Sequence, residues 1–245
     1  MRVATWNLQC VRPGTGARSA RIRDALASVA ADVLVLTESH PEFVPATGYV
    51  RRAVSAEAPD RERGGRWVVI WTRAEISCEP LEVRGEPERT AGIRVERTGA
   101  RPILIFGTVL PWRGDARRNH LRGGEAFAHS IALQAADWSE ARAAAQSAEL
   151  CVAGDFNQEF GAASPVGTRA GRAAFDHVLA THRLTCVTGG SCDPLLERGW
   201  RANIDHVLVS EGLRPVVATE VWPEQFPLPR TLSDHHGVCI RVPDA

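Results

Sequence analysis

The sequence predicts an α/β fold in which two mixed or mostly antiparallel sheets pack on each other, with helices outside. The first forty residues alternate strand, helix and strand. Short apolar runs separated by polar turns follow in the middle of the chain, and the second half again combines strands with a helix. Each sheet and helix must bury one apolar face, so strand-rich halves that each carry a helix favour packed layers.

The N-terminal region reads as a β-α-β unit. Residues 3–8 are a short apolar-rich run typical of a strand, and residues 32–37 (DVLVLT) are a continuous apolar run, as expected for a strand buried on both faces. Residues 18–31 are predicted to form a helix, with Ser19 as its N-cap. Its apolar positions lie at helical spacing: Ile22, Leu26 and Val29.

The remaining elements follow in order without a linker. A polar loop at 59–66 precedes an antiparallel ladder, and a long polar loop at 111–124 precedes an Ala-rich helix at 125–147. The other predicted strands are 67–72, 91–97, 102–110, 150–153, 204–210, 215–219 and 237–242, and the last helix is 172–182. We therefore expect one domain over residues 1–245.

The charge balance argues against a protein that coats nucleic acid. The chain has 29 arginines and no lysine. The number of arginines equals the number of acidic residues, which is also 29, so the net charge is +0. No global positive field attracts the chain to DNA, although a local basic face could still serve a nuclease. Most arginines are expected to be solvated surface residues.

The cysteines and the N-terminus favour a cytoplasmic protein with reduced thiols. None of the six cysteines forms a CxxC pair, so a zinc knuckle is not expected. Cys151 and Cys239 lie in apolar runs and are expected in the core, and we favour free thiols at Cys186 and Cys192 over a disulfide. A strand-like run begins at once, and no apolar stretch reaches the roughly 18 residues of a membrane anchor.

Polar side chains follow apolar strand runs at several places, where a side chain leaves the core at the edge of a sheet. In the GDFN segment, Asp155 and Asn157 lie two apart, so an extended chain would point both to one side and Phe156 into the core. Gly154 would allow close backbone approach. The full set of such groups is Asn7, Glu38, Asp155, Asn157, Asp205, Asp234 and His235.

These residue types fit metal-assisted chemistry on a phosphate. Hard cations such as Mg²⁺ prefer carboxylate oxygens and keep waters and substrate phosphate as further ligands. Glu38 is the best single ligand candidate because it ends a buried strand, and Asp234 is the second. His235 could stabilise charge on a phosphate, provided that a second group such as Asp205 fixes its tautomer.

The ordered segments resemble the endonuclease/exonuclease/phosphatase superfamily, which includes pancreatic-type deoxyribonucleases, abasic-site endonucleases, sphingomyelinases and inositol polyphosphate 5-phosphatases. One segment alone would be a weak signal, but the whole order covers nearly the entire chain. The segments are TWNLQ, LTESH, GDFNQ, IDHVLVS and SDHHG.

The resemblance implies a four-layer α/β sandwich and a divalent metal, Mg²⁺ or Mn²⁺. It implies that Glu38 binds the metal with support from Asn7, and that Asp234 lies by the metal or orients the site. Asp155 would orient or deprotonate the attacking water, and Asn157 would hold a phosphate oxygen. Asp205 and His235 would form a dyad at the scissile phosphate.

One position departs from the family pattern. Members usually carry a His or Tyr after the central strand, whereas this chain has Val109, which can donate nothing to a phosphate. The following loop could supply a substitute because guanidinium groups suit phosphate oxygens, although an arginine-rich solvated loop is an equal alternative. Trp112 could stack on a base or serve as a structural anchor. The candidate substrate-binding residues of this loop are Arg113, Arg117, Arg118 and His120.

Three functions stay open from sequence. The first is a phosphodiesterase or nuclease with DNA, RNA or a smaller diester as its phosphoester substrate. The second is a hydrolase of a small phosphorylated metabolite, which the neutral charge balance and the small size favour slightly. The third is a non-catalytic binding module of the same fold, to which Val109 points. One deep basic pocket would favour the small molecule, and a spread basic groove the nuclease.

Overall fold

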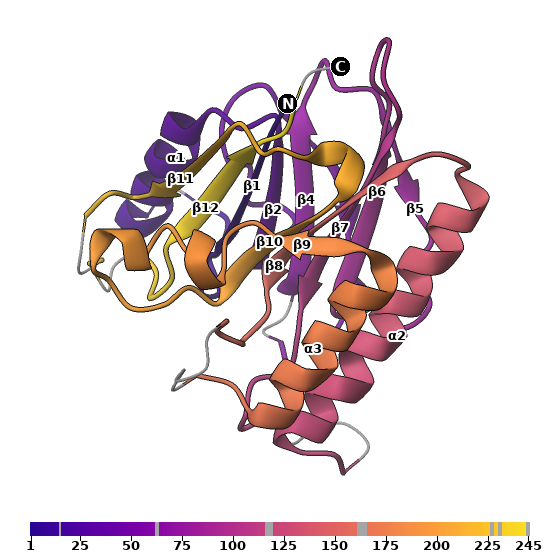
Figure 1. Cartoon of the computed structure of the whole chain (residues 1–245). Helices are drawn as coiled ribbons and strands as arrows, with labels where there is room; N and C mark the ends of the chain where they lie inside the picture. Colours follow the sequence, from indigo (N-terminus) through magenta and orange to yellow (C-terminus); the bar gives the residue numbers. More distant parts are fainter. Residues whose placement is uncertain are drawn as a thin grey trace.

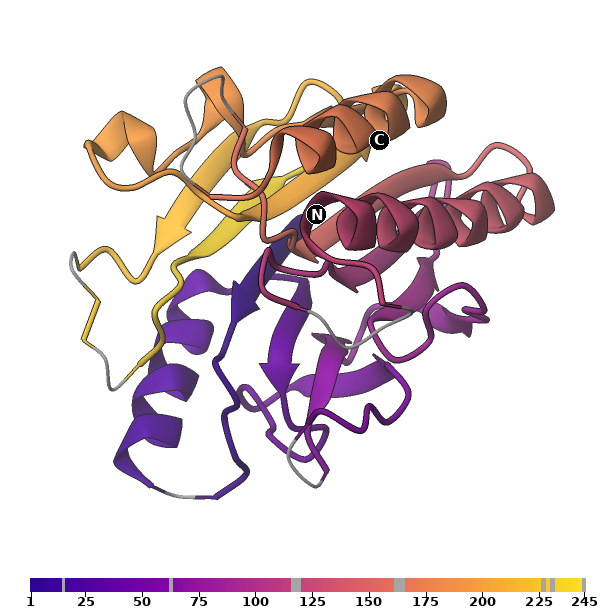
Figure 2. The same ribbon diagram turned by 90° about the horizontal axis from the view of Figure 1, so that it is seen from below.

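Two six-stranded sheets pack face to face in the computed structural model, which describes residues 1–14, 16–61, 64–115, 120–160, 166–225, 228–229 and 232–243. Helix α1 covers the outer face of one sheet, and α2 and α3 lie side by side over the outer face of the other (Figures 1 and 2). This helix–sheet–sheet–helix arrangement confirms the expected α/β sandwich.

The elements have the following bounds. The strands are β1 (Arg2–Asn7), β2 (Val33–Ser39), β3 (Tyr49–Val54), β4 (Arg66–Arg73), β5 (Cys78–Leu81), β6 (Thr90–Val95), β7 (Ile103–Val109), β8 (Glu149–Asp155), β9 (Leu184–Cys186), β10 (Asp205–Ser210), β11 (Ala218–Trp222) and β12 (Gly237–Arg241). The α-helices are α1 (Ala17–Val29), α2 (Gly123–Ala144) and α3 (Arg169–His182). Short 3₁₀ turns are at Gly190–Cys192, Leu196–Arg198 and Glu211–Leu213.

Both sheets follow one pattern of strand pairing. The first has the order β11-β12-β1-β2-β4-β3 and the second β5-β6-β7-β8-β10-β9. Each has one parallel pair, β1 with β2 and β7 with β8, and the other neighbours are antiparallel. A parallel pair needs a crossover, which α1 and α2 supply. The sheets are therefore mixed, as the sequence predicted.

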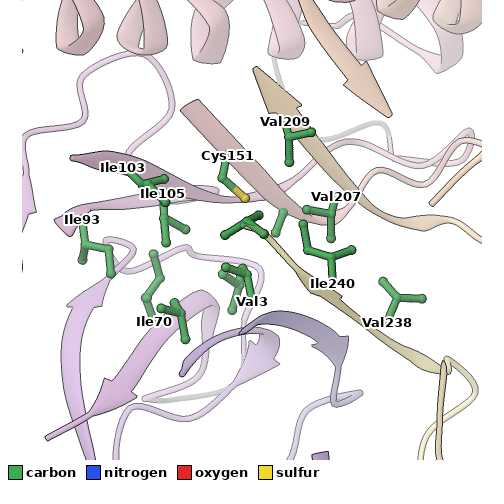
Figure 3. Packing of buried hydrophobic residues seen from close by; sticks show 14 of the residues in the cluster. Val3, Ile70, Ile93, Ile103, Ile105, Cys151, Val207, Val209, Val238 and Ile240 are labelled. Atoms are coloured by element: carbon green, nitrogen blue, oxygen red, sulfur yellow. The ribbon is translucent and has the colours of Figure 1, made fainter. Parts of the chain in front are cut away.

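The main core lies between the two sheets. Figure 3 shows its aliphatic side chains pointing toward one another from both sheets, among them Val3, Ile70, Ile105 and Val207. A second core packs α1 on the outer face of the first sheet, and a third packs α2 and α3 on the second. The central strands thus bury both faces, which explains the continuous apolar run at 33–36.

Alternation along the central strands sets which residues reach the gap between the sheets. In β2, Val33 and Val35 face the inter-sheet core, whereas Leu34 and Leu36 face α1. The same alternation directs Val3 in β1 and Val207 in β10 inward. The last inward positions of these strands gather at one end of the sandwich.

The structure corrects several element boundaries. Strands β3, β5 and β9 were not predicted; β3 carries exposed Arg51 and β5 carries Pro80, so these short strands lack a buried apolar pattern. Strand β11 begins three residues later than predicted. Ser19 is not the N-cap of α1, because Gly16 holds that position and the Ser19 hydroxyl donates to the Arg12 carbonyl at 3.1 Å.

The cysteines follow the sequence prediction. Cys151 and Cys239 are buried in the core, and Cys186 and Cys192 are free thiols. Among the described residues, no helix is long and apolar enough to cross a membrane.

Candidate active site

The candidate residues converge at one end of the two sheets. Asn7 is the last residue of β1, Asp155 the last of β8 and Asp205 the first of β10. Asp205 lies opposite Asp155 in the β8–β10 ladder, and alternation directs all three side chains into the gap between the sheets. The three are 1–2% exposed.

Asn7 joins the two sheets at this end. Its Nδ2 donates to Oε1 of Glu38 at 3.2 Å and to Oδ2 of Asp155 at 3.0 Å. Its Oδ1 accepts the Gln9 backbone N–H at 2.8 Å, which fixes the amide orientation. One amide group therefore positions two carboxylates that come from different sheets.

Glu38 sits at an irregular point of β2. Its φ of 47° breaks the extended alternation that would carry its side chain toward α1 after Leu36. Its Oε2 accepts from the Arg61 guanidinium at 3.1 Å and from the Cys10 thiol at 3.3 Å. Burial alone would raise the pKa of the Glu38 carboxyl, but Arg61, Asn7 and Cys10 outweigh it and lower that pKa. The Glu38 carboxylate is therefore favoured in its ionised form.

Asp205 and His235 form a closely paired dyad. The Nδ1 of His235 lies 2.5 Å from Oδ2 of Asp205, so Asp205 engages Nδ1 and not Nε2. The backbone N–H of Asp205 donates to Oδ1 of Asn203 at 3.0 Å. The Ser233 hydroxyl accepts the His235 backbone N–H at 3.1 Å and donates to the Asn7 carbonyl at 2.7 Å. The dyad is thus tied to the end of β1.

The electrostatics of this group are strongly perturbed. Burial raises the pKa of Asp155, and the adjacent charge of Asp205 raises it further. Burial likewise raises the pKa of Asp205, although His235 opposes this. Burial would lower the pKa of His235, but the Asp205 carboxylate overcomes it and raises that pKa, so the imidazole is held protonated. Perturbed pKa values in a buried cluster are typical of functional sites.

Two donor sets could hold a cation. Oxygen and nitrogen atoms of Asp155, Asp205 and His235 lie within 4.8 Å of one another. In this group, however, Nδ1 of His235 and Oδ2 of Asp205 already bind each other, so these two atoms are not available to a cation. The Glu38 side chain is 21% exposed and ionised, and its carboxylate fits a hard cation better.

Asn157 does not follow the expected extended path. Its φ is 49°, so the chain turns after Asp155 and the two side chains are not alternate residues of one strand. Its backbone N–H donates to Oδ1 of Asp155 at 2.9 Å, and its Nδ2 donates to the Leu110 carbonyl at 3.0 Å. Phe156 is buried, as predicted, and Gly154 approaches strand β7 so closely that an added Cβ would lie 2.0 Å from the Thr108 carbonyl oxygen.

The other predicted site residues lie outside this network. Asp234 is exposed and its Oδ1 lies 3.7 Å from Nε2 of His235. Arg113 and His120 are exposed. Among the described residues, neither forms a hydrogen bond with Asp155, Asp205 or His235. Arg117 and Arg118 lie outside the described residues.

The structure also places Val109, Trp112 and His206, three residues that the sequence analysis discussed. Val109 lies opposite Asp155 in the β7–β8 ladder, is 1% exposed and belongs to the inter-sheet core, so it fills the position with an apolar side chain. Trp112 is 57% exposed, which contradicts a role as a buried anchor. His206 is buried in the core, as predicted, with Nε2 2.9 Å from the Gln158 carbonyl.

Sequence reasoning missed Arg61, Cys10, Asn203 and Ser233. Arg61 and Cys10 contact Glu38 from loops, where an arginine or a cysteine carries no positional signal in a single sequence. Ser233 directly precedes the Asp234–His235 pair, and Asn203 lies two residues before Asp205. A search for side chains that cap the dyad's backbone could have found both.

A protein-family model described as Endonuclease/Exonuclease/phosphatase family matches residues 4–235. This span includes the segments that carry Asn7, Glu38, Asp155, Asp205 and His235. The chain belongs to this family. Membership supports a phosphoester hydrolase. A search of curated proteins found no match.

Solved structures share the fold over essentially the full length. A mannosyl-6-phosphatase from Bacteroides thetaiotaomicron is 16% identical, with 99% of each chain covered and a TM-score of 0.68. A 3′ phosphatase from Neisseria, solved with a product DNA hairpin, is 18% identical, with 99% of each chain covered and the same TM-score of 0.68. The endonuclease domain of the telomere-specific retrotransposon TRAS1 is 15% identical, covers 99% of this chain and 98% of its own, and has a TM-score of 0.67.

Proposed function

We propose that this protein is a divalent-metal-dependent phosphoester hydrolase, with phosphodiesters as its first substrate class. The observation that carries the proposal is the Asn7 amide, which joins Glu38 and Asp155 across the sheets beside the Asp205–His235 dyad. Two carboxylates and a cationic imidazole therefore lie together at one end of the sandwich, which supports a metal site beside a water-activating group.

The metal centre would be built on Glu38, with Asn7 holding its carboxylate in place. The ionised Glu38 carboxylate is a hard oxygen donor, and its charge is matched by the Arg61 guanidinium at 3.1 Å. Such a donor fits Mg²⁺ or Mn²⁺. When bound, that ion would neutralise charge on the phosphate oxygens. Asp234 is exposed and would contribute through His235 rather than as an inner ligand of the same cation.

The remaining residues would carry the proton and charge chemistry. Asp155 would orient the attacking water and accept its proton, because its raised pKa brings the carboxylate closer to neutral pH. His235, held by Asp205 through Nδ1, would donate from Nε2 to a phosphate oxygen on which negative charge develops. One N–H of the Asn157 Nδ2 group donates to the Leu110 carbonyl, and the other N–H would donate to a second phosphate oxygen.

Three solved structures of the same fold support this reaction class without choosing a substrate. One is a mannosyl-6-phosphatase, one a 3′ phosphatase with DNA and one an endonuclease domain. DNA, RNA and smaller phosphoesters therefore all remain candidate substrates. A hydrolase of small phosphorylated molecules is the second candidate, favoured by a basic cavity beside Glu38.

The deciding experiment measures cleavage of supercoiled plasmid at low salt and of bis(4-nitrophenyl) phosphate, each with Mg²⁺ or Mn²⁺ and with EDTA. Metal-dependent cleavage that is lost in His235→Ala is the expected result. Absence of plasmid nicking with cleavage of the small diester would select the small-molecule candidate. If the folded chain cleaves neither substrate with either metal, the non-catalytic module becomes the better interpretation.

A further inference from the structure

A cavity of about 560 Å³ opens next to Glu38 and has no role in the chemistry described above. Three segments form its wall: the loop after β1, the end of β2 and the loop before β4. We call it the Arg61 cavity. Its polar lining comes from Arg12, Ser39, His40 and Arg61, and Val11 and Pro13 add apolar surface. A volume of this size is typical of a small-molecule site and holds a phosphate with a small organic group.

Among the described residues, the guanidinium groups are the charged side chains that line the Arg61 cavity. Arg12 and Arg61 contribute two guanidinium groups, and none of the described residues that line the cavity is acidic. The Glu38 carboxylate lies just beyond the wall, where it binds Nη2 of Arg61. A cavity with two guanidinium groups on its wall attracts an anion, and planar guanidinium groups match phosphate and carboxylate oxygens.

Arg61 is held in place before any ligand arrives. Its side chain is only 9% exposed and stacks on the Trp67 ring, with 4.1 Å from the guanidinium carbon to the ring centroid. Arg89 lies over the same ring at 4.7 Å, so Trp67 is packed between two guanidinium groups. Such packing reduces the side-chain entropy that binding a ligand would otherwise cost.

The hydrogen bonds of Arg61 leave donor capacity. Its polar contacts with described residues use Nη2, which donates to Glu38 at 3.1 Å and to the Cys10 sulfur at 2.8 Å. Its Nε is buried and has no hydrogen-bond partner among the described residues. An arginine side chain has five N–H donors, and the contacts with Glu38 and Cys10 both use Nη2, so an anion in the cavity can accept from Nη1.

We propose that the Arg61 cavity is a subsite for a second anionic group of the substrate, and that the preferred substrate is a small phosphoester with a further phosphate. The inference rests on the proposed function, because it places the scissile phosphate at Glu38 and His235.

The first test measures binding of inorganic pyrophosphate in EDTA by calorimetry, so it does not depend on catalysis. Wild type and His235→Ala should bind alike. Arg61→Gln and Arg12→Gln should each weaken binding at least about tenfold, the loss expected for a charge-assisted hydrogen bond. Arg241→Gln, an exposed residue at the far end of β12, is the matched control and should bind like wild type. Thermal melting checks that each variant is folded.

Several outcomes of this binding test would overturn the proposal. One is a folded wild type that does not bind pyrophosphate. A second is binding that His235→Ala removes but Arg61→Gln and Arg12→Gln retain, which would place the anion at the dyad. Equal weakening in Arg241→Gln would show general charge attraction. Binding of a ten-nucleotide oligothymidylate in place of pyrophosphate would assign the cavity to nucleic acid instead.

The second test uses two matched chromogenic diesters with Mn²⁺: thymidine 5′-(4-nitrophenyl phosphate) and the same compound with a 3′-phosphate. Wild type should show the higher kcat/KM on the 3′-phosphorylated compound, and Arg12→Gln should remove that preference while cleaving the plain diester. Equal kcat/KM values in wild type would contradict the subsite. If wild type cleaves neither compound, the proposed function fails, and the pyrophosphate result alone decides the subsite.

Discussion

Replacing Asp205 by Asn separates the charge of the dyad from its shape. The backbone of Asp205 is fixed by pairing with Asp155 in β8 and by the bond from its N–H to Asn203. An asparagine keeps this geometry and can still accept from Nδ1 of His235. What it loses is the negative charge that lies 2.5 Å from the imidazole. The substitution therefore tests whether a protonated, oriented His235 is required.

The expected loss of activity is large and the expected loss of stability moderate. Without the carboxylate, burial dominates at His235 and its pKa falls, so the ring no longer stays protonated. Neutralising a carboxylate that orients a catalytic histidine costs up to about 10⁴-fold in kcat. We expect about 10²- to 10⁴-fold for Asp205→Asn, which corresponds to about 3–5 kcal/mol of transition-state stabilisation. Because His235 then loses its proton, no buried charge is left unpaired, and the free energy of unfolding should fall by about 1–3 kcal/mol, the cost of an impaired buried hydrogen bond.

The assay measures kcat on bis(4-nitrophenyl) phosphate with saturating Mn²⁺, beside urea unfolding of each variant. Asp137→Asn is the matched control, since Asp137 is also a buried carboxylate but accepts the Gly85 backbone N–H away from the site. The double variant Asp205→Asn with His235→Ala should be no slower than His235→Ala alone, because the two residues act as a unit.

Two results would refute the dyad. One is a folded Asp205→Asn that keeps kcat within about threefold of wild type, since the charge would then be unnecessary. The other is a double variant whose loss equals the product of the single losses, since independent residues multiply their effects.

Three further substitutions have defined outcomes. Glu38→Gln should weaken Mn²⁺ binding more than about 100-fold by calorimetry, because even outer-shell partners of a metal are worth about 10- to 100-fold; unchanged affinity would move the metal to another ligand. Gly154→Ala should lower the free energy of unfolding by about 3 kcal/mol or more in urea, because its Cβ would lie 2.0 Å from a backbone oxygen; a change below about 1 kcal/mol would contradict the contact. Burial lowers the pKa of His206 to about 4, whereas in the unfolded chain it protonates near 6.5, so stability falls as pH drops through this window. Wild type should therefore lose about 2–3 kcal/mol more than His206→Gln between pH 7.5 and 4.5, and parallel losses would show that His206 titrates normally.

The proposed subsite and the proposed reaction meet at Glu38. Its carboxylate is paired with Arg61 on one side and with Asn7 on the other. Loading a cation at Glu38 would weaken its attraction to Arg61 and so leave more of the guanidinium's charge for an anion in the cavity. Metal and substrate would then support each other's binding.

The sequence by itself determined the layered fold and most of the residues of the candidate site. Continuous apolar runs such as 33–36 mark strands covered on both faces, and the helical spacing of Ile22, Leu26 and Val29 marks α1. Each strand that ends in a polar residue predicts a side chain at a sheet edge, so Asn7 and Asp155 could be singled out without coordinates. Edge strands such as β5 were missed because they bury little apolar surface.

Only the tertiary structure decided which groups touch. The pattern could not show that the φ of Glu38 is positive, nor that Asn157 turns away from an extended path, since both depend on contacts between strands distant in sequence. Arg61 is the clearest case. As one of 29 arginines it carries no signal in the sequence, and it joins the candidate site because folding packs it on Trp67 and pairs it with Glu38. Alternation and burial are local consequences of the chain, whereas an ion pair between a loop and a strand exists only after the sheets have closed.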